Sequence, residues 1–420
     1  MPLSLKISLF LKVLTYILKF FWRLVKAILI CLAIILLFPL LLYILPARYN
    51  FPEPRPFEGK QWFNPYSGMD STHWLHANFH MHSRAWAGLT DGSENKDHHV
   101  YDTYRKAGFE SVSISNYQSI NKLYSDDSSY IPAYEHGYGL YKNHHLCLGA
   151  KRVVWFDLPY GQNVHHKQFI LNKLRPTTEA ISINHPSFFK GFRPDDFTEL
   201  TGYDFIEVLN GFRNSVPHWD SALSAGRPAL ILANDDMHDI NNIKEIGRRF
   251  TVINAPTNAR PQIINALKEG NAFGVYYQGE EEESLHDKTG NFARLPVMKS
   301  FTVKNDTLRI ELDTTAFEFR FFGQHGKLLK KTSGTRDAFY VLKPDDKYVR
   351  TVILFSTKSN PEGLQFFLNP VMRSAGGNKP EMPQVTINQT ITVLTRVGLT
   401  LVFLLVILAY IRIMQVRKNK

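Results

Sequence analysis

Two long apolar runs, one near each end of the chain, place the strongest constraint on its fold. Residues 27–45 read AILICLAIILLFPLLLYIL without a charged side chain, which is about the length of helix needed to cross a bilayer core of ~30 Å. Residues 397–411 are also uncharged, and this run reaches a similar length when 391–394 are added and Arg396 extends to the interface. We therefore predict transmembrane helices at 27–46 and 391–411.

Basic residues lie on the outer side of both runs, and they predict the topology. The N-terminal set is Lys6, Lys12, Lys19, Arg23 and Lys26, and the C-terminal set is Arg412, Arg417, Lys418 and Lys420. By the positive-inside rule, the basic N-terminus (1–26) and the basic tail (412–420) are cytoplasmic, and everything between the spans lies outside the cytoplasmic (inner) membrane. A cleaved signal peptide is the alternative for the first run, but the following LPARYN lacks a small-x-small site.

The same residues account for most of the charge. The formal net charge is +11, of which five charges lie before the first span and four in the tail, leaving +2 for the rest. The basic composition is therefore typical of membrane topology, and we predict no nucleic-acid partner. Cys31 lies in the first span and Cys147 outside it, so we expect no disulfide, no cysteine-ligated zinc and no thiol nucleophile.

The region between the spans shows two patterns. A Pro- and aromatic-rich segment, 47–66, is predicted to be a linker. Residues 67–280 then alternate short apolar strands with amphipathic helices, which favours an α/β domain with a largely parallel sheet. The expected strands are 76–82, 111–115, 180–186, 205–211 and 228–236, and the expected helices are 97–108, 218–226 and 261–270.

The pattern changes after residue 280. Residues 281–294 are charged and rich in turn residues, and we interpret them as a linker. Between 295 and 375 the chain reads as successive strands with no helical stretch, which predicts a small β-sandwich domain whose role is packing or spacing. The expected strands are 297–303, 307–313, 317–323, 339–343 and 348–355, and a further linker at 376–390 leads to the second span.

Polar residues gather at the carboxyl ends of the predicted strands of the α/β domain, the edge at which such domains build sites. His80 and His82 share one face of their strand while Phe79 and Met81 share the other. Two adjacent imidazoles suit a divalent ion such as zinc, manganese or iron. In a chain with 16 histidines this pair also arises by chance. The other polar residues at these strand ends are Ser115, Asn116, His185, Glu207, Asn210, Asp235, Asp236 and His238. A metal site is favoured by His185, Asp235, Asp236 and His238 together with four residues of the segment 134–149, which are Glu135, His136, His144 and His145.

An ordered series of short motifs resembles a known family. The segments are NFHMHS (78–83), LTDG (89–92), AYEHG (133–137), HHLCLG (144–149), INHP (183–186) and NDDMH (234–238). They resemble, in the same order, the motifs of the PHP domain, named for polymerase and histidinol phosphatase. That domain is a distorted seven-stranded (β/α)7 barrel whose members are mostly metal-dependent phosphoesterases. The resemblance covers about 72–277, and 246–256 and 263–274 are similar to the segment with which many members end.

The resemblance implies a ligand set and a reaction. His80, His82, Glu135 and Asp236 would hold one metal, and Glu135 as a bridge, His145 and His185 would hold a second. A hydroxide held between two cations would attack a phosphate mono- or diester, with Glu135, Asp236 and His238 as catalytic residues. We therefore expect a membrane-anchored phosphoesterase with two divalent ions, Zn, Mn or Fe.

The chain departs from the family at a third metal. The family's T-D-H motif is replaced by Ser115, Asn116 and Tyr117. Asp91 and His238 match the other ligands of that site, but two ligands hold a divalent ion poorly. We expect a binuclear centre, or a weak third site. Asn116 and Tyr117 are interpreted either as substrate-binding residues or as a sign of lost activity.

Two further expectations concern partners. Among the arginines near strand ends (Arg193, Arg213, Arg248 and Arg249), Arg213 is the preferred ligand of the non-reacting phosphate oxygens. Anchoring at both ends favours a phosphorylated substrate that is lipid- or envelope-linked. The alternative function is a binding or sensing ectodomain that keeps the barrel, has lost turnover and uses the β-sandwich as its partner surface.

Overall fold

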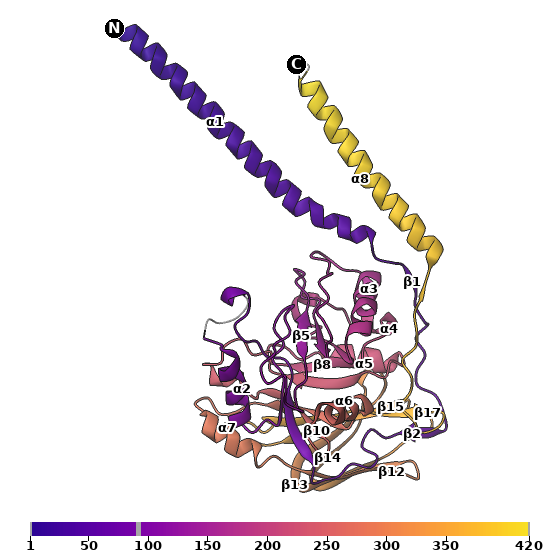
Figure 1. Cartoon of the computed structure of the whole chain (residues 1–420). Helices are drawn as coiled ribbons and strands as arrows, with labels where there is room; N and C mark the ends of the chain where they lie inside the picture. The colour runs from indigo at the N-terminus through magenta and orange to yellow at the C-terminus, as the bar shows by residue number, and fades with distance from the viewer. Residues whose placement is uncertain (1, 90–93, 419–420) are drawn as a thin grey trace. The chain divides into compact units, whose positions relative to one another are not determined.

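The computed structural model describes residues 2–89 and 94–418 (Figure 1). It separates into two units along the chain. One comprises Met1–Arg48 with Ile387–Lys420, and the other comprises Tyr49–Thr386.

The first unit consists of two long apolar helices, indigo and yellow in Figure 1. Helix α1 (Leu3–Leu37) continues as the 3-10 helix η1 (Phe38–Ile44), and α8 spans Gln389–Lys418. The segments Ile7–Ile44 and Gln389–Val416 are long and apolar enough to cross a membrane, which is compatible with both predicted spans. Arg396, expected to extend to the interface, donates to the Leu45 carbonyl at 2.6 Å.

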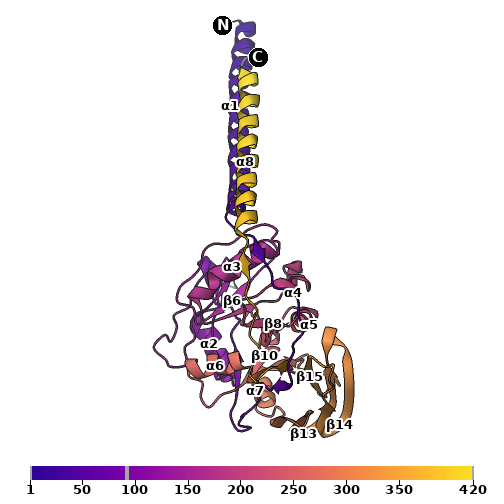
Figure 2. The same cartoon turned by 90° about the vertical axis from the view of Figure 1, so that its right-hand side faces the viewer.

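The second unit contains a large sheet in which, among the described residues, eleven strands are joined. Its order is β12-β13-β15-β16-β11-β10-β3-β4, with β14 on β13, β17 on β15 and β2 on β17. Figure 2 shows β13 and β14 as the long orange strands. The bounds are β2 (Gln61–Phe63), β3 (Trp74–Asn78), β4 (Ser111–Val112), β10 (Arg249–Asn254), β11 (Ala272–Tyr277), β12 (Met298–Lys304), β13 (Thr307–Phe322), β14 (Leu328–Val341), β15 (Tyr348–Phe355), β16 (Leu364–Leu368) and β17 (Val371–Ser374).

This sheet corrects the prediction of a separate β-sandwich at 295–375. The predicted strands form, but β16 pairs antiparallel with β11, so they continue the sheet of the preceding region. The rings of Phe273 in β11 and Phe366 in β16 pack at 4.8 Å, and Phe366 packs on Phe355 at 4.9 Å. The apolar side chains of the two regions therefore pack together, and one hydrophobic cluster contains Phe250 and Val275 with Phe301, Phe319 and Ile353.

A smaller sheet of five strands lies beside the predicted site residues. Its order is β5-β6-β7-β8-β9, comprising Ala133–His136, His145–Leu148, Ala180–Ile183, Phe205–Asn210 and Leu230–Asn234. Only β7, β8 and β9 are parallel, because β6 pairs antiparallel with both β5 and β7. Among the described strands, the parallel pairing that we predicted is thus limited to these three and to β3 with β4.

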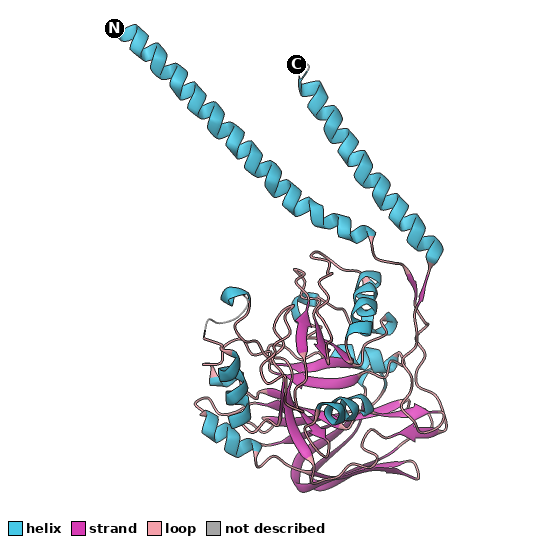
Figure 3. Cartoon of the chain, viewed as in Figure 1, coloured by secondary structure: helices cyan, strands magenta, loops and turns pink. Residues whose placement is uncertain are grey.

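The described strands do not form a closed seven-stranded barrel. The strands expected in it are divided between the two sheets, as the magenta arrows of Figure 3 show. The described residues also contain two isolated parallel bridges. One joins Met81 to Met237, and the other joins Tyr117 to Glu135. The architecture shown is a mixed α/β unit with several sheets.

The three predicted helices form as α2 (Asp97–Lys106), α5 (Val216–Ser224) and α6 (Arg260–Glu269). Helix α7 (Leu285–Phe292) lies in the segment that we interpreted as a linker at 281–294, and Ser284 and Asp287 form a capping box at its start. Helix α3 was missed because it buries polar side chains such as Lys167 and therefore shows no clean apolar stripe. The remaining elements are α3 (Val164–Leu174), α4 (Asp196–Glu199), β1 (Tyr49–Asn50), β18 (Thr386–Ile387), η2 (Trp86–Gly88), η3 (Arg175–Thr177), η4 (Phe188–Lys190), η5 (Ile243–Glu245) and η6 (Gln324–Gly326).

The predicted linker at 47–66 packs along the second unit from Tyr49 onward. Phe57, Phe63 and Tyr66 are buried, and β2 pairs with β17. The Arg55 carbonyl lies so close to Gly226 (φ 73°) that a Cβ there would be 1.8 Å from it. The aromatic side chains of this segment therefore serve as core residues.

Candidate metal centre

His80 and His82 follow the end of β3, where the backbone runs beside the segment that follows β9. The His80 carbonyl accepts from the Asp236 backbone N–H at 2.9 Å, and the His82 N–H donates to the Met237 carbonyl at 2.9 Å. Phe79 N–H donates to the Asn234 side chain at 2.8 Å. These contacts carry both imidazoles and the Asp236 carboxylate to one place.

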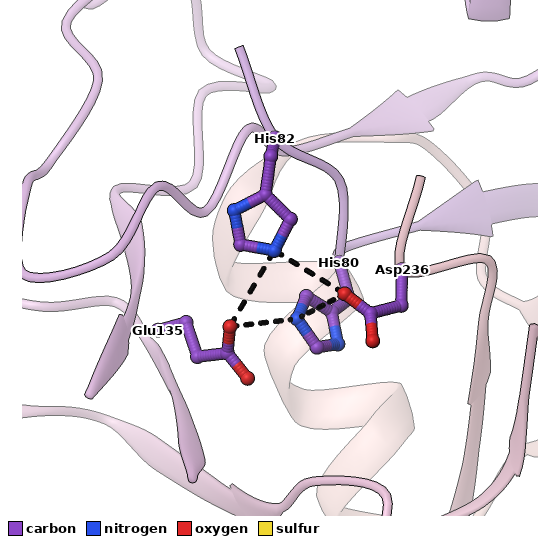
Figure 4. A group of neighbouring side chains, drawn as sticks. All are labelled: His80, His82, Glu135 and Asp236. Carbon is purple, nitrogen blue, oxygen red and sulfur yellow. Dashed lines mark hydrogen bonds and ion pairs between the residues drawn. The ribbon is translucent and has the colours of Figure 1, made fainter. Parts of the chain in front are cut away.

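A first group of ligand atoms converges there. His80 Nε2 lies 3.2 Å from both Glu135 Oε2 and Asp236 Oδ1. His82 Nε2 lies 3.4 Å from Glu135 Oε2 and 3.2 Å from Asp236 Oδ1 (Figure 4). All four residues are buried, and one ligand atom from each lies within 4.8 Å of the others. The prediction that both imidazoles face the same side is confirmed.

A second group shares Glu135 with the first. Glu135 Oε1 lies 3.0 Å from His144 Nδ1 and 3.0 Å from His185 Nε2. Glu135 thus turns one carboxylate oxygen toward each group. A carboxylate in this position is suited to bridge two cations.

Of the two adjacent histidines, the structure places His144 in the second group, whereas the resemblance implied His145. His145 begins β6, and its ring packs against His136 at 5.8 Å and Phe192 at 5.7 Å. Because successive side chains of an extended chain point to opposite faces, only one of two adjacent histidines can face Glu135. The motif identified the pair, and the register of β6 decides which member reaches the carboxylate.

The sequence interpretation assigned no role to Glu207, a buried carboxylate in the middle of β8. Its Oε1 lies 2.8 Å from His80 Nδ1 and accepts from Asn234 at 3.0 Å. Its Oε2 accepts from the His185 N–H and from Asn210, each at 3.0 Å. A carboxylate on the outer nitrogen orients a metal-binding imidazole and fixes its tautomer. An acid within the apolar strand FIEVLN was the signal, since a buried carboxylate requires partners.

The donor atoms suit a divalent cation. His80 Nε2, Glu135 Oε2 and His144 Nε2 are buried and have no hydrogen bond of acceptable geometry within the described part of the chain. A buried polar atom without a partner is costly, and imidazole nitrogens with carboxylate oxygens are the ligands that zinc, manganese and iron take. The cluster can therefore bind divalent metal ions.

Electrostatics favour the charged form of the carboxylates in this cluster. Burial raises the pKa of Glu135, but His80 and His144 outweigh it and hold that pKa well below the usual range. Burial likewise raises the pKa of Asp236, and His80, His238 and His82 reverse the effect and hold it well below normal. Ionised carboxylates are the form that binds a cation.

Two residues of the cluster have strained backbones. His185 has φ 28° and Asp236 has φ 53°, both in the left-handed region. Such conformations cost roughly 1–3 kcal/mol for non-glycine residues and gather at functional sites. Glu207 holds His185 by accepting from its backbone N–H. Asn210 holds Asp236 by donating to its Oδ2 at 3.2 Å.

The residues considered for a third metal do not form a comparable group. Asp91 lies outside the described residues. His238 Nε2 lies 3.3 Å from Asp236 Oδ1, and its ring stacks on His82 at 4.3 Å. Tyr117 stacks on His82 at 4.5 Å. The rings of Tyr117 and His238, two of the residues considered for the third metal, therefore both stack on His82 of the first group.

Asn116 and Arg213 do not reach the cluster as expected for substrate-binding residues. Asn116 is buried, and its amide accepts from the Ser83 N–H and donates to Ser83 Oγ, each at 2.8 Å. Its hydrogen bonds therefore hold the turn after His82. Arg213 is exposed after β8, and in the described chain no contact joins it to either ligand group.

Comparisons with known proteins are distant. No family model matches the chain, and no curated protein matches it. It is similar to a two-domain protein from Bacteroides vulgatus containing a predicted PHP-like metal-dependent phosphoesterase, at 14% identity and a TM-score of 0.37, covering 76% of this chain and 99% of that one. It is also similar to PsfC from Pseudomonas syringae, at 10% identity and a TM-score of 0.34, covering 52% of this chain and 98% of that one.

Proposed function

We propose that this chain is a membrane-anchored, metal-dependent phosphoesterase of the PHP type. The observation that carries the proposal is the pair of buried ligand groups that share Glu135. Their members come from motifs that resemble the PHP series in order, with His144 in place of His145. Carboxylates and imidazoles in this arrangement suit two divalent ions, for which zinc, manganese and iron are the candidates.

Divalent ions bound there would activate water near neutral pH and neutralise charge on phosphate oxygens. The protein's own residues prepare this chemistry. Glu207 holds the proton of His80 on Nδ1 and leaves Nε2 directed at the carboxylates. His238, whose side chain is 28% exposed, lies beside Asp236 on the open side of the cluster, where it would transfer a proton to the leaving alcohol.

We further propose that β3 to β9, although divided between two sheets, surround one distorted barrel that is closed only by isolated bridges. The bridges Met81–Met237 and Tyr117–Glu135 support this, because they connect the ends of the five-stranded sheet to the extensions of β3 and β4. The ligand groups would then lie at one mouth of the barrel. The two apolar helices support a two-span protein whose site is extracytoplasmic and whose substrate is lipid- or envelope-linked.

A binding or sensing module is the second candidate. One observation favours it: the Tyr117 ring covers His82 at 4.5 Å, where a further metal ligand is expected. Such a protein would bind metal and a phosphorylated ligand without turnover.

The test is metal content and hydrolysis by the full-length chain in detergent. We expect about two divalent ions per chain by elemental analysis and turnover of a phosphomonoester or phosphodiester in a panel. His80→Ala and Asp236→Asn should lose metal and activity. His286→Ala, an exposed histidine outside the cluster, is the matched control and should keep both. Metal-free, inactive protein would refute the proposal, and metal-loaded protein without turnover would favour the binding module.

A further inference from the structure

Partly exposed side chains contact the buried ligand groups. His80, His82, Glu135 and His185 are almost completely buried, whereas Tyr117, Lys142 and His238 are half-buried. These three side chains therefore lie between the buried ligand groups and solvent-exposed parts of the surface. Of the three, only Lys142 carries a permanent positive charge near neutral pH.

Lys142 lies over the ring that contacts both ligand groups. Its Nζ is 5.6 Å from the centroid of the Tyr117 ring. The same ring is 4.5 Å from the His82 ring and 5.3 Å from the His144 ring. The ammonium group is thus separated from a histidine of each group by a single aromatic ring.

The backbone holds Lys142 in a conformation that costs energy. Its φ is 54°, a left-handed value that is unfavourable for a residue with a Cβ. Its N–H donates to the Gly139 carbonyl at 3.1 Å, and the neighbouring Asn143 side chain donates to the Gly191 carbonyl. Gly191 packs so closely that a Cβ there would lie 2.5 Å from the Tyr141 carbonyl. Glycine would fit position 142 with less strain, yet a lysine occupies it.

We propose that Lys142 binds the outer oxygens of a terminal phosphate group and so makes a phosphomonoester the preferred substrate. This inference rests on the proposed phosphoesterase function. A terminal phosphate has three unesterified oxygens and a charge of about −1.5 to −2 at pH 7, because its second pKa is about 6. A diester has two unesterified oxygens and a single negative charge. An ammonium in this position therefore stabilises the monoester more, as a compact point charge does for phosphate.

The test uses the full-length, manganese-loaded chain in detergent with inorganic phosphate as the probe. Calorimetric titration measures phosphate affinity, and p-nitrophenyl phosphate with bis(p-nitrophenyl) phosphate measures monoester and diester turnover. The variants are Lys142→Gly, which removes the charge and relieves the backbone strain, and Lys142→Arg, which keeps the charge. Lys190→Gly is the matched control, because Lys190 is an exposed lysine with φ 55°.

We expect Lys142→Gly to bind phosphate about 10- to 100-fold more weakly, the usual effect of losing a hydrogen bond to a charged group. Its kcat/KM should fall for the monoester far more than for the diester, with metal content and thermal stability retained. Lys142→Arg should restore most of the phosphate affinity, and Lys190→Gly should leave it unchanged.

The outcomes separate this inference from the proposed function. Equal phosphate affinity in Lys142→Gly and the unmodified chain, or equal losses in Lys142→Gly and Lys190→Gly, would overturn the role of Lys142 while leaving hydrolysis intact. Equal losses of monoester and diester turnover in Lys142→Gly would overturn the substrate preference. Weaker phosphate binding by Lys142→Gly, in a protein that hydrolyses neither ester, would support Lys142 as a phosphate ligand and refute the phosphoesterase.

Discussion

His80 Nδ1 lies 2.8 Å from Glu207 Oε1, and both side chains are completely buried. This contact places Nδ1 against the Glu207 carboxylate and leaves His80 Nε2 as the nitrogen that faces Glu135 and Asp236. Glu207 also accepts from three other groups, so its position is defined by the strand ends around it. The orientation of the first ligand group thus depends on a residue that is not itself a ligand.

Replacement of Glu207 by glutamine should weaken metal binding by about 10- to 100-fold, the range seen when such supporting carboxylates are changed. Glutamine preserves the size of the side chain but removes the charge that fixes the His80 tautomer. Competition with a chelator of known affinity measures the effect. Glu311→Gln, an exposed glutamate of β13, is the control, and equal affinities in the two variants would contradict the role of Glu207.

His144→Ala and His145→Ala should differ in metal content. His144 faces Glu135, so its removal should lower the number of bound ions per chain by about one. His145 faces away from Glu135, so its removal should leave the metal content unchanged and affect only stability. Elemental analysis of the two variants decides between them, and the reverse pattern would return the ligand role to His145.

Gly226→Ala should destabilise the protein by about 2–4 kcal/mol. The alanine would be strained in the left-handed backbone conformation of this position, and its Cβ would displace the Arg55 carbonyl. Gly108→Ala isolates the strain, since Gly108 has φ 95° and no atom within 4 Å of the added Cβ. That control should cost about 1 kcal/mol. Denaturant unfolding in detergent measures both free energies, and equal losses would show that the segment around Arg55 does not pack as described.

Arg350→Ala should lower the free energy of unfolding by about 3–5 kcal/mol. Arg350 donates from Nε and Nη2 to the two carboxylate oxygens of Asp220 at 2.6 and 2.8 Å, and both residues are buried. Removal of the arginine would leave an unpaired buried carboxylate between α5 and β15. Arg309→Ala removes the exposed pair with Asp337 and should cost no more than about 1 kcal/mol. Comparable losses in these two variants would contradict this account.

A reporter enzyme fused after Lys420 tests the topology. Because the basic residues at both ends predict cytoplasmic termini, a reporter that is active only in the cytoplasm should be active when it is fused after Lys420. A second fusion within the exposed Glu280–Glu282 segment should be inactive, because that segment is predicted to lie outside. Activity of the internal fusion would overturn the two-span arrangement.

The sequence placed His80, His82 and Asp236 near strand ends because that prediction depends on local geometry, although β3 ends at Asn78 and β9 at Asn234. His80 and His82 share a face by the two-residue repeat of an extended chain. Asp236 follows a strongly apolar strand, β9, whose position is evident from LILAN. The metal roles of these residues stay predictions, but their convergence in space followed from where their strands end.

Other features of the fold and the site could not be predicted from local sequence patterns. The HHLC segment does not show which histidine faces Glu135, because the register of β6 is set by its pairing with β5 and β7. Residues 295–375 look like an independent sandwich because short strands follow one another there with no helical stretch between them. Their pairing with β11 depends on packing between Phe273 and Phe366, which lie far apart in the sequence.

The sequence by itself determined the two apolar helices, the positions of about half of the described strands and the residue types of the cluster, since these depend on composition and short periodicity. The tertiary structure alone decided that His144 rather than His145 lies beside Glu135, that Glu207 contacts His80, that Asn116 bonds to Ser83, and that Lys142 lies over the Tyr117 ring. Each of these depends on which side chain a strand register or a strained turn directs inward, and that direction is set by contacts between distant segments.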